Sequence, residues 1–471
     1  MQKLFGTIFL ILILMSLWAW RLQPPPDGKL VWVSDDNPRR TEQIALFNKE
    51  QAAGLLNVPG IPPHPPTGLK LDPSNVGLEK VIVQSLGGVG PDIFDCGDYK
   101  SLSAYVRSGI ALDITDALKA RGVSLDSVWD CVKPFCVYNG RVYGWPSNAA
   151  VNALWLNQDM FEKEGIPLPA KRPWTWEEFI PLAQRLTKRD AAGHVTQYGF
   201  LADWFFLWPI CLYQWGGHIY TPDGTRCIID SPEAIAGIQF AHDLIYKYHI
   251  MPSPFEEAAL SGQGGWGQGN IKWFGAGKGA TAIGGRWWLC TLRDQTHPMQ
   301  NGKPLPPTLR LRVVECPHGP LRVFQGYGRC ALINATSPRA QEALDFIVFM
   351  TRKPYNDLIN AQADANAAVK KYCDTPEFLH DPKYPEEQDN DVWRDIMKLG
   401  VPEEVSPFVD GQAVQRILDV QLDLVKSNQK SPADALHTAA QKINAEIQKM
   451  LAQDPVLRRQ YEALTRKSSG K

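Results

Sequence analysis

Short apolar runs alternate with helical segments near the start of the chain, and this alternation constrains the fold more than any other feature. The run LVWVS at 30–34 is followed by the loop DDNPRR and by the helical pattern TEQIALFNKEQ. A second buried run, DIFDC, follows a glycine turn and leads into a helical segment that starts at Tyr99. Such alternation is typical of an α/β layered fold with a largely parallel sheet.

The length of the chain predicts more than one domain. A chain of 471 residues exceeds what one compact core usually holds. Helical patterns become more frequent between 150 and 300, where Thr175 and Glu178 have the spacing of a capping box. The segment 54–74 is too rich in proline for regular structure, whereas the tail 410–468 has a helical pattern.

The N-terminus carries the pattern of an export signal. Lys3 precedes an uncharged, apolar run from Leu4 to Trp20, and Arg21 and the linker QPPPDG follow it. The run is at the lower limit of length for crossing a bilayer. We expect an uncleaved anchor, with cleavage after Ala19 as the alternative and a buried apolar helix as the remaining option. Either of the first two places the rest of the chain outside the cytoplasm.

The charge and the cysteines set further limits. The net charge of -1 indicates no bulk attraction to nucleic acid or to an acidic membrane. The chain has nine cysteines, an odd number, so at least one thiol is left over. Export permits disulfides, and Cys131 and Cys136 are close enough in sequence to pair, although spacing does not determine pairing.

The stretch GKGATAIGGRWWLC, residues 277–290, has two interpretations. Its glycines and lysine suggest a loop that holds a phosphate, whereas its paired tryptophans suggest the wall of a pocket for a flat apolar face. A phosphate loop needs GxxxxGK followed by Ser or Thr, but Gly279 follows Lys278 and a lysine occupies position 272. Nucleotide hydrolysis is therefore not expected from this stretch.

Other catalytic signatures are missing from the sequence. Neither G-x-S-x-G nor H-E-x-x-H occurs, and the nine histidines are dispersed, so no metal or cofactor is expected. A glycosidase needs only two suitably placed carboxylates, which need not be close in the chain. A carbohydrate-active enzyme therefore stays open as the main enzymatic alternative.

Several segments together resemble a known family. They occur in the order GPDIFDCGDYKSLSAYVRSGIALDIT, YGWPSNAAVNALWLNQDMFEKEGI, RPWTWEEFIPLAQRLT, GKGATAIGGRWWL and GRCALINATSPRAQEALDFIVFM. In this order they resemble the extracellular solute-binding proteins of ABC importers (family 1), of the maltose- and glycerol-phosphate-binding kind. The resemblance covers roughly residues 28 to 380.

The resemblance implies a two-lobe periplasmic-binding-protein fold of type II, with the ligand between the lobes and a hinge crossed about three times. Residues 1–27 would be the signal or anchor segment and linker. The first lobe would comprise 28–145 and 315–358. The second would comprise 146–314 and 359–471, including additional C-terminal helices.

The resemblance also implies ligand-binding residues. Trp287 matches the family's sugar-stacking tryptophan, and Trp288 lies beside it. A rigid aromatic plane can cover the apolar C–H face of a pyranose, while polar groups pair with its hydroxyls. The other positions carried over from the resemblance are Asp35, Asp36, Asp98, Tyr99, Trp145, Asp203, Phe205, Trp208 and Tyr327. Two further candidates are Trp204, which adds a ring beside them, and Arg286, which would suit a phosphate.

Some of these positions have structural alternatives. Asp98 and Tyr99 could cap and solvate a helix, Trp208 could pack in the core, and Arg286 suits either a phosphate or a salt bridge. The sequence also departs from the family. The insertion 54–74 has no counterpart, and residues 360–372 lack the proline of the family's ligand loop, so ligand contacts are not carried over to them.

The implied function is that of a monomeric carbohydrate-binding subunit of an importer, not an enzyme. It would lie in the periplasm or another extracytoplasmic space, tethered by the N-terminal helix if that helix is retained. Ligand would close the hinge, and the closed form would dock on the membrane subunits of an ABC permease. A degenerate sensory or structural binding module is the second alternative, beside the glycosidase.

Overall fold

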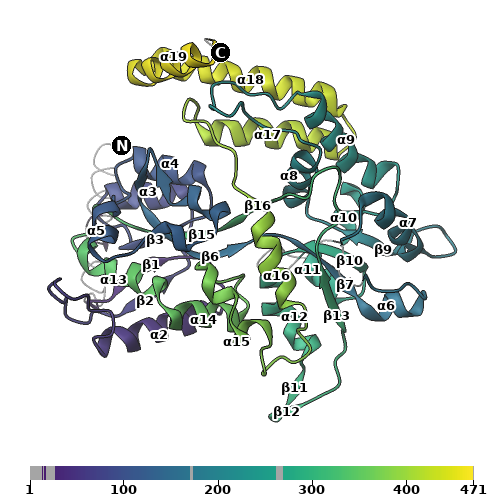
Figure 1. Ribbon diagram of the computed structural model, residues 1–471, viewed down its shortest axis with the longest axis horizontal. Helices are drawn as coiled ribbons and strands as arrows, with labels where there is room; N and C mark the ends of the chain where they lie inside the picture. Colours follow the sequence, from purple (N-terminus) through teal and green to yellow (C-terminus); the bar gives the residue numbers. More distant parts are fainter. Residues whose placement is uncertain (1–12, 14, 17–26, 170–172, 261–268, 470–471) are drawn as a thin grey trace, which may run out of the picture.

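A computed structural model describes residues 13, 15–16, 27–169, 173–260 and 269–469. Two five-stranded sheets, each flanked by helices, form two lobes that lie side by side (Figure 1). The chain is therefore α/β, as expected. The predicted signal or anchor segment lies outside the described residues except for Ile13, Met15, Ser16 and Asp27.

The first sheet has the strand order β2-β1-β3-β15-β6. Its strands are β1 (Leu30–Val33), β2 (Leu69–Asp72), β3 (Ile93–Cys96), β6 (Gly144–Ala150) and β15 (Tyr327–Ile333). The three strands β2, β1 and β3 are parallel, but β15 is antiparallel to both β3 and β6. The expected parallel order therefore holds for β2, β1 and β3. It ends at β15, because the chain reaches this strand from the other lobe.

Helices surround the first sheet because its strands are apolar on both faces. The adjacent residues Ile93 and Phe94 of β3 point to opposite faces and have no exposed surface, and the Trp32 ring of β1 lies 4.9 Å from that of Phe346. The helices of this lobe are α2 (Arg40–Ala52), α3 (Leu78–Leu86), α4 (Tyr99–Arg107), α5 (Thr115–Ala120), α13 (Ala340–Thr351) and α14 (Lys353–Gln362). Short elements between α5 and β6 are η1 (Leu125–Ser127), η2 (Asp130–Phe135), β4 (Val137–Tyr138) and β5 (Arg141–Val142).

The second sheet has the order β13-β7-β10-β9-β8 and is mostly antiparallel. Its strands are β7 (Ala153–Asn157), β8 (Lys188–Arg189), β9 (Val195–Leu201), β10 (Gly279–Gly284) and β13 (Leu311–Val314). Its helices are α6 (Gln158–Lys163), α7 (Trp176–Leu186), α8 (Trp204–Gln214), α9 (Pro232–Tyr246), α10 (Pro254–Leu260), α11 (Asn270–Gly275), η3 (Arg286–Trp288) and α12 (Leu289–Thr296). The predicted capping box of Thr175 and Glu178 is confirmed at the start of α7. A hairpin of β11 (Met299–Gln300) and β12 (Lys303–Pro304) projects from this lobe (Figure 1).

The chain passes between the lobes at three places. The first lies between β6 and β7, and the second lies between β13 and β15. The third follows residue 373, because Asn366 still exchanges backbone hydrogen bonds with Ala149 of β6, whereas Asp389 accepts hydrogen bonds from Arg312 of β13. A parallel pair of short strands, β14 (Phe324–Gln325) and β16 (Gly400–Val401), lies near these crossings.

Two of the predicted lobe boundaries fall inside secondary structure. The boundary after residue 145 falls within β6, and the boundary after residue 358 falls within α14. Only Val151 and Asn152 separate β6 from β7, and neither a glycine nor a proline marks this crossing in the sequence. From sheet membership, we propose a first lobe of 28–150 and 327–373, with the second lobe starting after the crossing at 151–152.

The insertion 54–74 contains a strand that its prolines concealed. Residues 69–72 follow the last of the clustered prolines and form β2, which pairs with β1 at the edge of the first sheet. The expectation of no regular structure was therefore wrong for these four residues. No proline interrupts Leu69–Asp72, so all four backbone groups can join the ladder.

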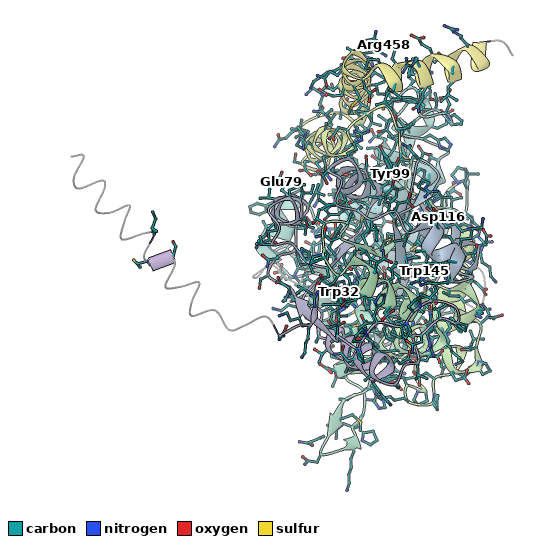
Figure 2. All side chains as sticks on the ribbon, turned by 90° about the vertical axis from the view of Figure 1, so that its left-hand side faces the viewer. Trp32, Glu79, Tyr99, Asp116, Trp145 and Arg458 are labelled. Atoms are coloured by element: carbon teal, nitrogen blue, oxygen red, sulfur yellow. The ribbon has the colours of Figure 1, made fainter. Side chains whose placement is uncertain are left out.

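The C-terminal region is helical, as expected. Its elements are η4 (Lys370–Cys373), α15 (Pro376–Leu379), α16 (Asn390–Ile396), η5 (Met397–Leu399), α17 (Gly411–Lys426), α18 (Pro432–Gln453) and α19 (Pro455–Ser469). Helices α17 to α19 lie above both lobes in Figure 1, and α17 contacts α4 while α18 contacts α9. In the side view they lie above Trp32 and Trp145 of the first lobe (Figure 2). None of the described helices is both long and apolar enough to cross a bilayer.

Candidate functional site

A cavity of ≈ 290 Å³ lies between the two lobes. The first lobe and the crossing segments contribute most of the lining, and Phe206 and Trp287 contribute from the second lobe. The lining residues are Asp35, Asn37, Asn148, Ala150, Phe206, Trp287, Tyr327, Gly328, Arg329, Asp364 and Ala365. A second cavity of ≈ 300 Å³ lies at the β13 edge of the second sheet, between that strand and residues 386–393. We take the cavity between the lobes as the candidate site, because both lobes and the segments that cross between them line it.

Three aromatic rings form one wall of the cavity. The rings of Trp287 and Tyr327 lie 5.3 Å apart with their planes at 81°. The Phe206 ring lies 5.2 Å from that of Tyr327 and 6.1 Å from that of Trp287. The Tyr327 hydroxyl donates a hydrogen bond to Oδ1 of Asn152 at the first crossing. This wall therefore joins the second lobe to the hinge.

The glycines of GKGATAIGGRWWLC position the Trp287 ring. Strand β10 ends at Gly284, and a Cβ on Gly285 would lie only 1.4 Å from Cζ3 of Trp287. The indole therefore rests directly on the Gly285 backbone, which no larger residue permits. Trp288 points the other way, into the core, where its ring is stacked on Trp155 at 6.0 Å.

Phe206 is positioned by the start of α8. Asp203 is the N-cap of this helix, and its carboxylate accepts a hydrogen bond from the Phe205 backbone N–H. Phe205 points outward and is 58% exposed, whereas the next residue, Phe206, turns its ring into the cavity. Asp203 therefore does not line the cavity itself, but it fixes the start of α8 from which the Phe206 ring points into the cavity.

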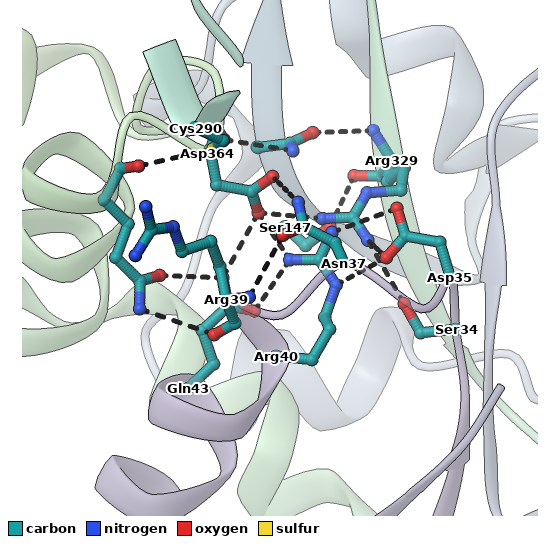
Figure 3. Close-up of polar contacts among 12 residues, drawn as sticks. Ser34, Asp35, Asn37, Arg39, Arg40, Gln43, Ser147, Cys290, Arg329 and Asp364 are labelled. Carbon is teal, nitrogen blue, oxygen red and sulfur yellow. Dashed lines mark hydrogen bonds and ion pairs between the residues drawn. The ribbon is translucent and has the colours of Figure 1, made fainter. Parts of the chain in front are cut away.

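Arg329 is at the centre of a network of polar side chains, the polar floor, which also includes Asp35, Asp95, Asp364 and Arg40 (Figure 3). Its Nη1 lies 3.1 Å from Oγ of Ser34, 3.3 Å from Oδ1 of Asp35 and 3.2 Å from Oδ2 of Asp95. Its Nη2 donates to Asp364 at 3.1 Å. The register of β15 shifts between Arg329 and Cys330, so Arg329 lines the cavity at an irregularity of the strand.

Asp364 joins the floor from the segment after α14. Its carboxylate accepts hydrogen bonds from Arg40 at 2.5 Å, from Asn37 at 3.1 Å and from Gln43 at 3.2 Å, in addition to Arg329 (Figure 3). The residues on either side, Ala363 and Ala365, both have positive φ, 57° and 68°. Non-glycine residues adopt this conformation at a cost, so the surrounding contacts must hold the loop in place.

Arg286 supplies part of that support. Its side chain is 2% exposed, and Nη1 donates to the backbone carbonyls of Asn360 at 2.8 Å and of Ala365 at 3.2 Å. Burial, which outweighs the pairing with Glu387, lowers the pKa of Arg286 to about 10. These two hydrogen bonds hold the Asp364 loop in place. Because the Arg286 side chain is buried and does not line the cavity, its guanidinium does not face a ligand.

The charges of the floor sum to a net negative value. Asp35, Asp95 and Asp364 face the guanidinium groups of Arg40 and Arg329, which gives three carboxylates against two cations. Burial alone would raise the pKa of Asp35 and Asp364, but Arg329 and Arg40 outweigh it and hold both pKa values below the ordinary range. At Asp95 burial prevails, and its pKa is raised.

Acid should therefore destabilise the fold through Asp35 and Asp364. Their pKa values are lower when folded, so the stability they add is present above about pH 4, the ordinary carboxyl pKa, and is lost as pH falls further. Asp95 acts in the opposite direction, since its raised pKa makes folding less favourable as pH rises. We expect the free energy of unfolding in urea to fall between pH 4 and pH 2. Asp364→Asn should show a shallower fall, and an equal slope in both proteins would contradict this assignment.

Of the residues predicted from the sequence, three line the cavity: Asp35, Trp287 and Tyr327. Asp98 and Asp203 cap α4 and α8, which for Asp98 was the stated alternative. Asp36 and Phe205 are exposed outside the cavity, and Trp208 is half-buried against the core. Tyr99 stacks on Tyr138, and the buried side chains are Trp145, Trp204, Arg286 and Trp288. These ten lie outside the cavity because capping or core packing takes up their side chains, or because they point into solvent.

Several cavity residues were not predicted from the sequence. Phe206 adjoins the predicted Phe205, so the local pattern was correct there but the side-chain direction was not, whereas Arg329 lies two residues after the predicted Tyr327 on the same strand and was not singled out. Asp364 lies within the segment from which no contact was carried over, because the family's proline is absent there. Asn37 and Asn148 had no distinguishing signal, since single asparagines in loops and strands are common.

Solved structures with the same fold bind solutes. An ABC substrate-binding protein of Listeria monocytogenes, in complex with cycloalternan, is 18% identical, with a TM-score of 0.69 over 88% of this chain and 98% of that one. A Thermotoga lettingae solute-binding protein bound with α-D-tagatose is 19% identical, with a TM-score of 0.68 over 89% and 99% of the two chains. Maltose-bound MalE3 of T. maritima is 18% identical, with a TM-score of 0.66 over 88% and 98%. At these identities the likeness shows the fold, which is the two-lobe periplasmic-binding-protein fold.

Sequence comparison identifies the family. A protein of Brucella abortus, named only as a binding protein, is 28% identical over 184 residues, which are 37% of this chain and 41% of that relative's length. Residues 68–357 match the family described as bacterial extracellular solute-binding protein. Because this match extends over more than half of the chain, the protein belongs to the bacterial extracellular solute-binding proteins.

Proposed function

We propose that the protein is the carbohydrate-binding subunit of an ABC importer and that it binds a neutral sugar between its lobes. The observation that carries this proposal is that one cavity is lined both by the aromatic wall of Trp287, Phe206 and Tyr327 and by Asp35 and Arg329 of the polar floor. A sugar ring has an apolar C–H face and a rim of hydroxyls, and this cavity offers a partner for each.

The division of the cavity between the lobes supports hinge closure. Trp287 and Phe206 belong to the second lobe, whereas Asp35, Asn148 and Arg329 belong to the first. A ligand that touches both groups gains its full contacts only when the lobes are together, so it favours the closed state. The closed form would then deliver the sugar to a membrane permease.

The charge of the floor favours a neutral ligand over a phosphorylated one. Arg329 already contacts Asp35, Asp95 and Asp364, and Arg40 is paired with Asp35 and Asp364. A phosphate would have to break these pairs and would face the surplus carboxylate. Hydroxyl groups can instead donate to Asp35, which is the most exposed carboxylate of the floor at 36%.

The same carboxylates argue against the glycosidase alternative. A glycosidase needs a general acid whose pKa is raised, so that it carries a proton near neutral pH. Both carboxylates that line this cavity, Asp35 and Asp364, have lowered pKa values because of Arg40 and Arg329. They are therefore suited to accepting hydrogen bonds and poorly suited to donating a proton.

A thermal-shift screen tests the proposal. The purified protein is heated with neutral mono- and disaccharides, with polyols, and with their phosphate esters. A ligand at 100 times its Kd should add about 2.7 kcal/mol of stability, which corresponds to a shift of several degrees. We expect one class of neutral sugar to raise the Tm and to be recovered unchanged. Hydrolysis of that sugar, or stabilisation by phosphate esters alone, would contradict the proposal.

Two adjacent phenylalanines provide a matched pair of variants. Phe206→Ala removes a ring from the cavity wall and should weaken binding of the sugar about tenfold, as expected for one aromatic contact. Phe205→Ala removes an equal ring that is 58% exposed on the neighbouring position of α8, and should leave the Kd within about twofold. Calorimetric titration of both variants measures the difference, and equal losses would remove Phe206 from the site.

We also propose that the described part of the chain acts as a monomer outside the cytoplasm, held near the membrane if the N-terminal segment is retained. The support for this location is the family, whose members are extracellular, together with the export pattern of residues 1–27.

A further inference from the structure

Two buried thiols of the first lobe are in direct contact. Sγ of Cys136 lies 2.9 Å from Sγ of Cys330, although the two residues are 194 positions apart in the chain. A disulfide has an S–S distance of about 2.0 Å, so the two sulfur atoms need to move together by only about 0.9 Å. Neither side chain has exposed surface.

The packing around Cys330 directs its sulfur toward Cys136. A Cβ on Gly144 of the adjacent strand β6 would lie 2.5 Å from Sγ of Cys330, so the sulfur fills the space that this glycine leaves. Cys136 follows η2 directly, and η2 packs on both β6 and β15. The two sulfur atoms therefore share one small enclosed space.

The other neighbouring cysteines are placed less well. Cys131, which the sequence suggested as a partner for Cys136, points toward the β14–β16 pair, where a Cβ on Gly326 would lie 2.5 Å from its Sγ. Cys96 is opposite Cys330 in the β3–β15 register, but its thiol donates to the backbone carbonyl of Asp98 at 3.1 Å. Among the described cysteines, Cys136 is therefore the best-placed partner for Cys330.

We propose that Cys136 and Cys330 form a disulfide when the protein folds outside the cytoplasm. The two S–H bonds break and one S–S bond forms, while two protons and one electron pair pass to the disulfide of a thiol–disulfide oxidoreductase, whose S–S bond breaks to give a dithiol. This inference rests on the extracytoplasmic location given under the proposed function, because disulfides persist in oxidising compartments. It does not depend on which solute the cavity binds.

The bond would connect the two chain segments that flank the second lobe. Cys136 precedes the first crossing and Cys330 follows the second, so the closed loop contains all five strands of the second sheet. Closing so long a loop restricts the unfolded chain strongly. The bond would also fix β15 immediately after Arg329, the central residue of the cavity floor.

Burial determines when the bond can form. Exchange requires a thiolate, and burial raises the pKa of the Cys330 thiol well above its ordinary value. Oxidation should therefore occur during folding, before the core closes. Once formed, the bond should resist reductants as long as the protein stays folded.

Peptide mapping tests the proposal on the unmodified protein. Protein from an oxidising compartment is unfolded with iodoacetamide and without reductant, digested, and analysed by mass spectrometry. We expect one crosslinked peptide pair that contains Cys136 and Cys330 and that disappears on reduction. Alkylation of all nine cysteines, or a crosslink between Cys96 and Cys330, would overturn the proposal.

Variants give a second readout. Cys136→Ser with Cys330→Ser should lower the Tm of the oxidised protein by about 5 °C or more, and should leave the reduced, cytoplasmically produced protein much less affected. Cys211→Ser is the matched control, because Cys211 is fully buried and its thiol contacts none of the other described cysteines by hydrogen bond. An equal Tm loss in oxidised and reduced protein would mean that the thiols only fill space. Sugar binding is not part of either readout, so a failure here is separate from a failure of the proposed function.

Discussion

Replacing Trp287 by alanine is expected to weaken sugar binding by about two orders of magnitude. A buried aromatic anchor at the centre of a binding site is worth about 2–4 kcal/mol, and every 1.4 kcal/mol is a factor of ten in Kd. The Trp287 ring is supported from below by the Gly285 backbone and flanked by Phe206 and Tyr327, so its orientation is set before any ligand binds. Isothermal titration of the sugar that emerges from the thermal screen measures the change.

A second tryptophan serves as the control for this variant. Trp208 lies on α8 of the same lobe and is half-buried, but it does not line the cavity. Trp208→Ala should change the Kd by less than about threefold, even if it lowers the Tm. A comparable loss of affinity in both variants would indicate general damage to the lobe. An unchanged Kd in Trp287→Ala would contradict the assignment of the aromatic wall as a sugar-binding surface.

Replacing Asp364 by alanine is expected to lower the free energy of unfolding by about 3–5 kcal/mol and to abolish detectable sugar binding. Among the described residues, the variant leaves Arg40, whose side chain is 1% exposed, with the half-exposed Asp35 as its one ion-pair partner, and it removes one of the contacts of Arg329. Breaking a buried ion pair from one side costs this much, because the other charge stays desolvated. The floor would then lose the arrangement that orients Arg329.

The neighbouring carboxylate Asp36 is the control for Asp364. It follows the same strand as Asp35 but is exposed and does not line the cavity. Asp36→Ala should change the free energy of unfolding in urea by less than about 0.5 kcal/mol, as for most surface substitutions. If Asp364→Ala proves as stable as Asp36→Ala, the pairing of Asp364 with Arg40 and Arg329 contributes nothing to the fold, and the assigned floor is wrong.

The fold could be predicted from the sequence because its signals are local. Strand–helix alternation, the capping box at Thr175 and the ordered family segments each depend on residues close together in the chain. Errors arose where a signal was hidden or missing. Prolines concealed β2, and the chain passes from β6 to β7 without a glycine or proline between the two strands.

The cavity was harder to predict because it depends on side-chain direction. The sequence pattern marked Trp287 and Tyr327, but at α8 it favoured Phe205 over Phe206, and only the helix start at Asp203 decides which ring points inward. The polar floor depends on contacts between residues about 300 positions apart, such as Arg329 with Asp35 and Asp364 with Arg40. No local pattern contains such contacts.

Calorimetric competition tests whether the cavity between the lobes binds a neutral sugar. The neutral sugar from the thermal screen is titrated into the unmodified protein, alone and in the presence of an excess of its phosphate ester. We expect a saturable heat with one sugar per chain and a Kd that the phosphate ester leaves unchanged, because the floor between the lobes carries a surplus negative charge. No saturable heat with any neutral sugar, or displacement of the sugar by its phosphate ester, would contradict the assignment of this cavity as a neutral carbohydrate site.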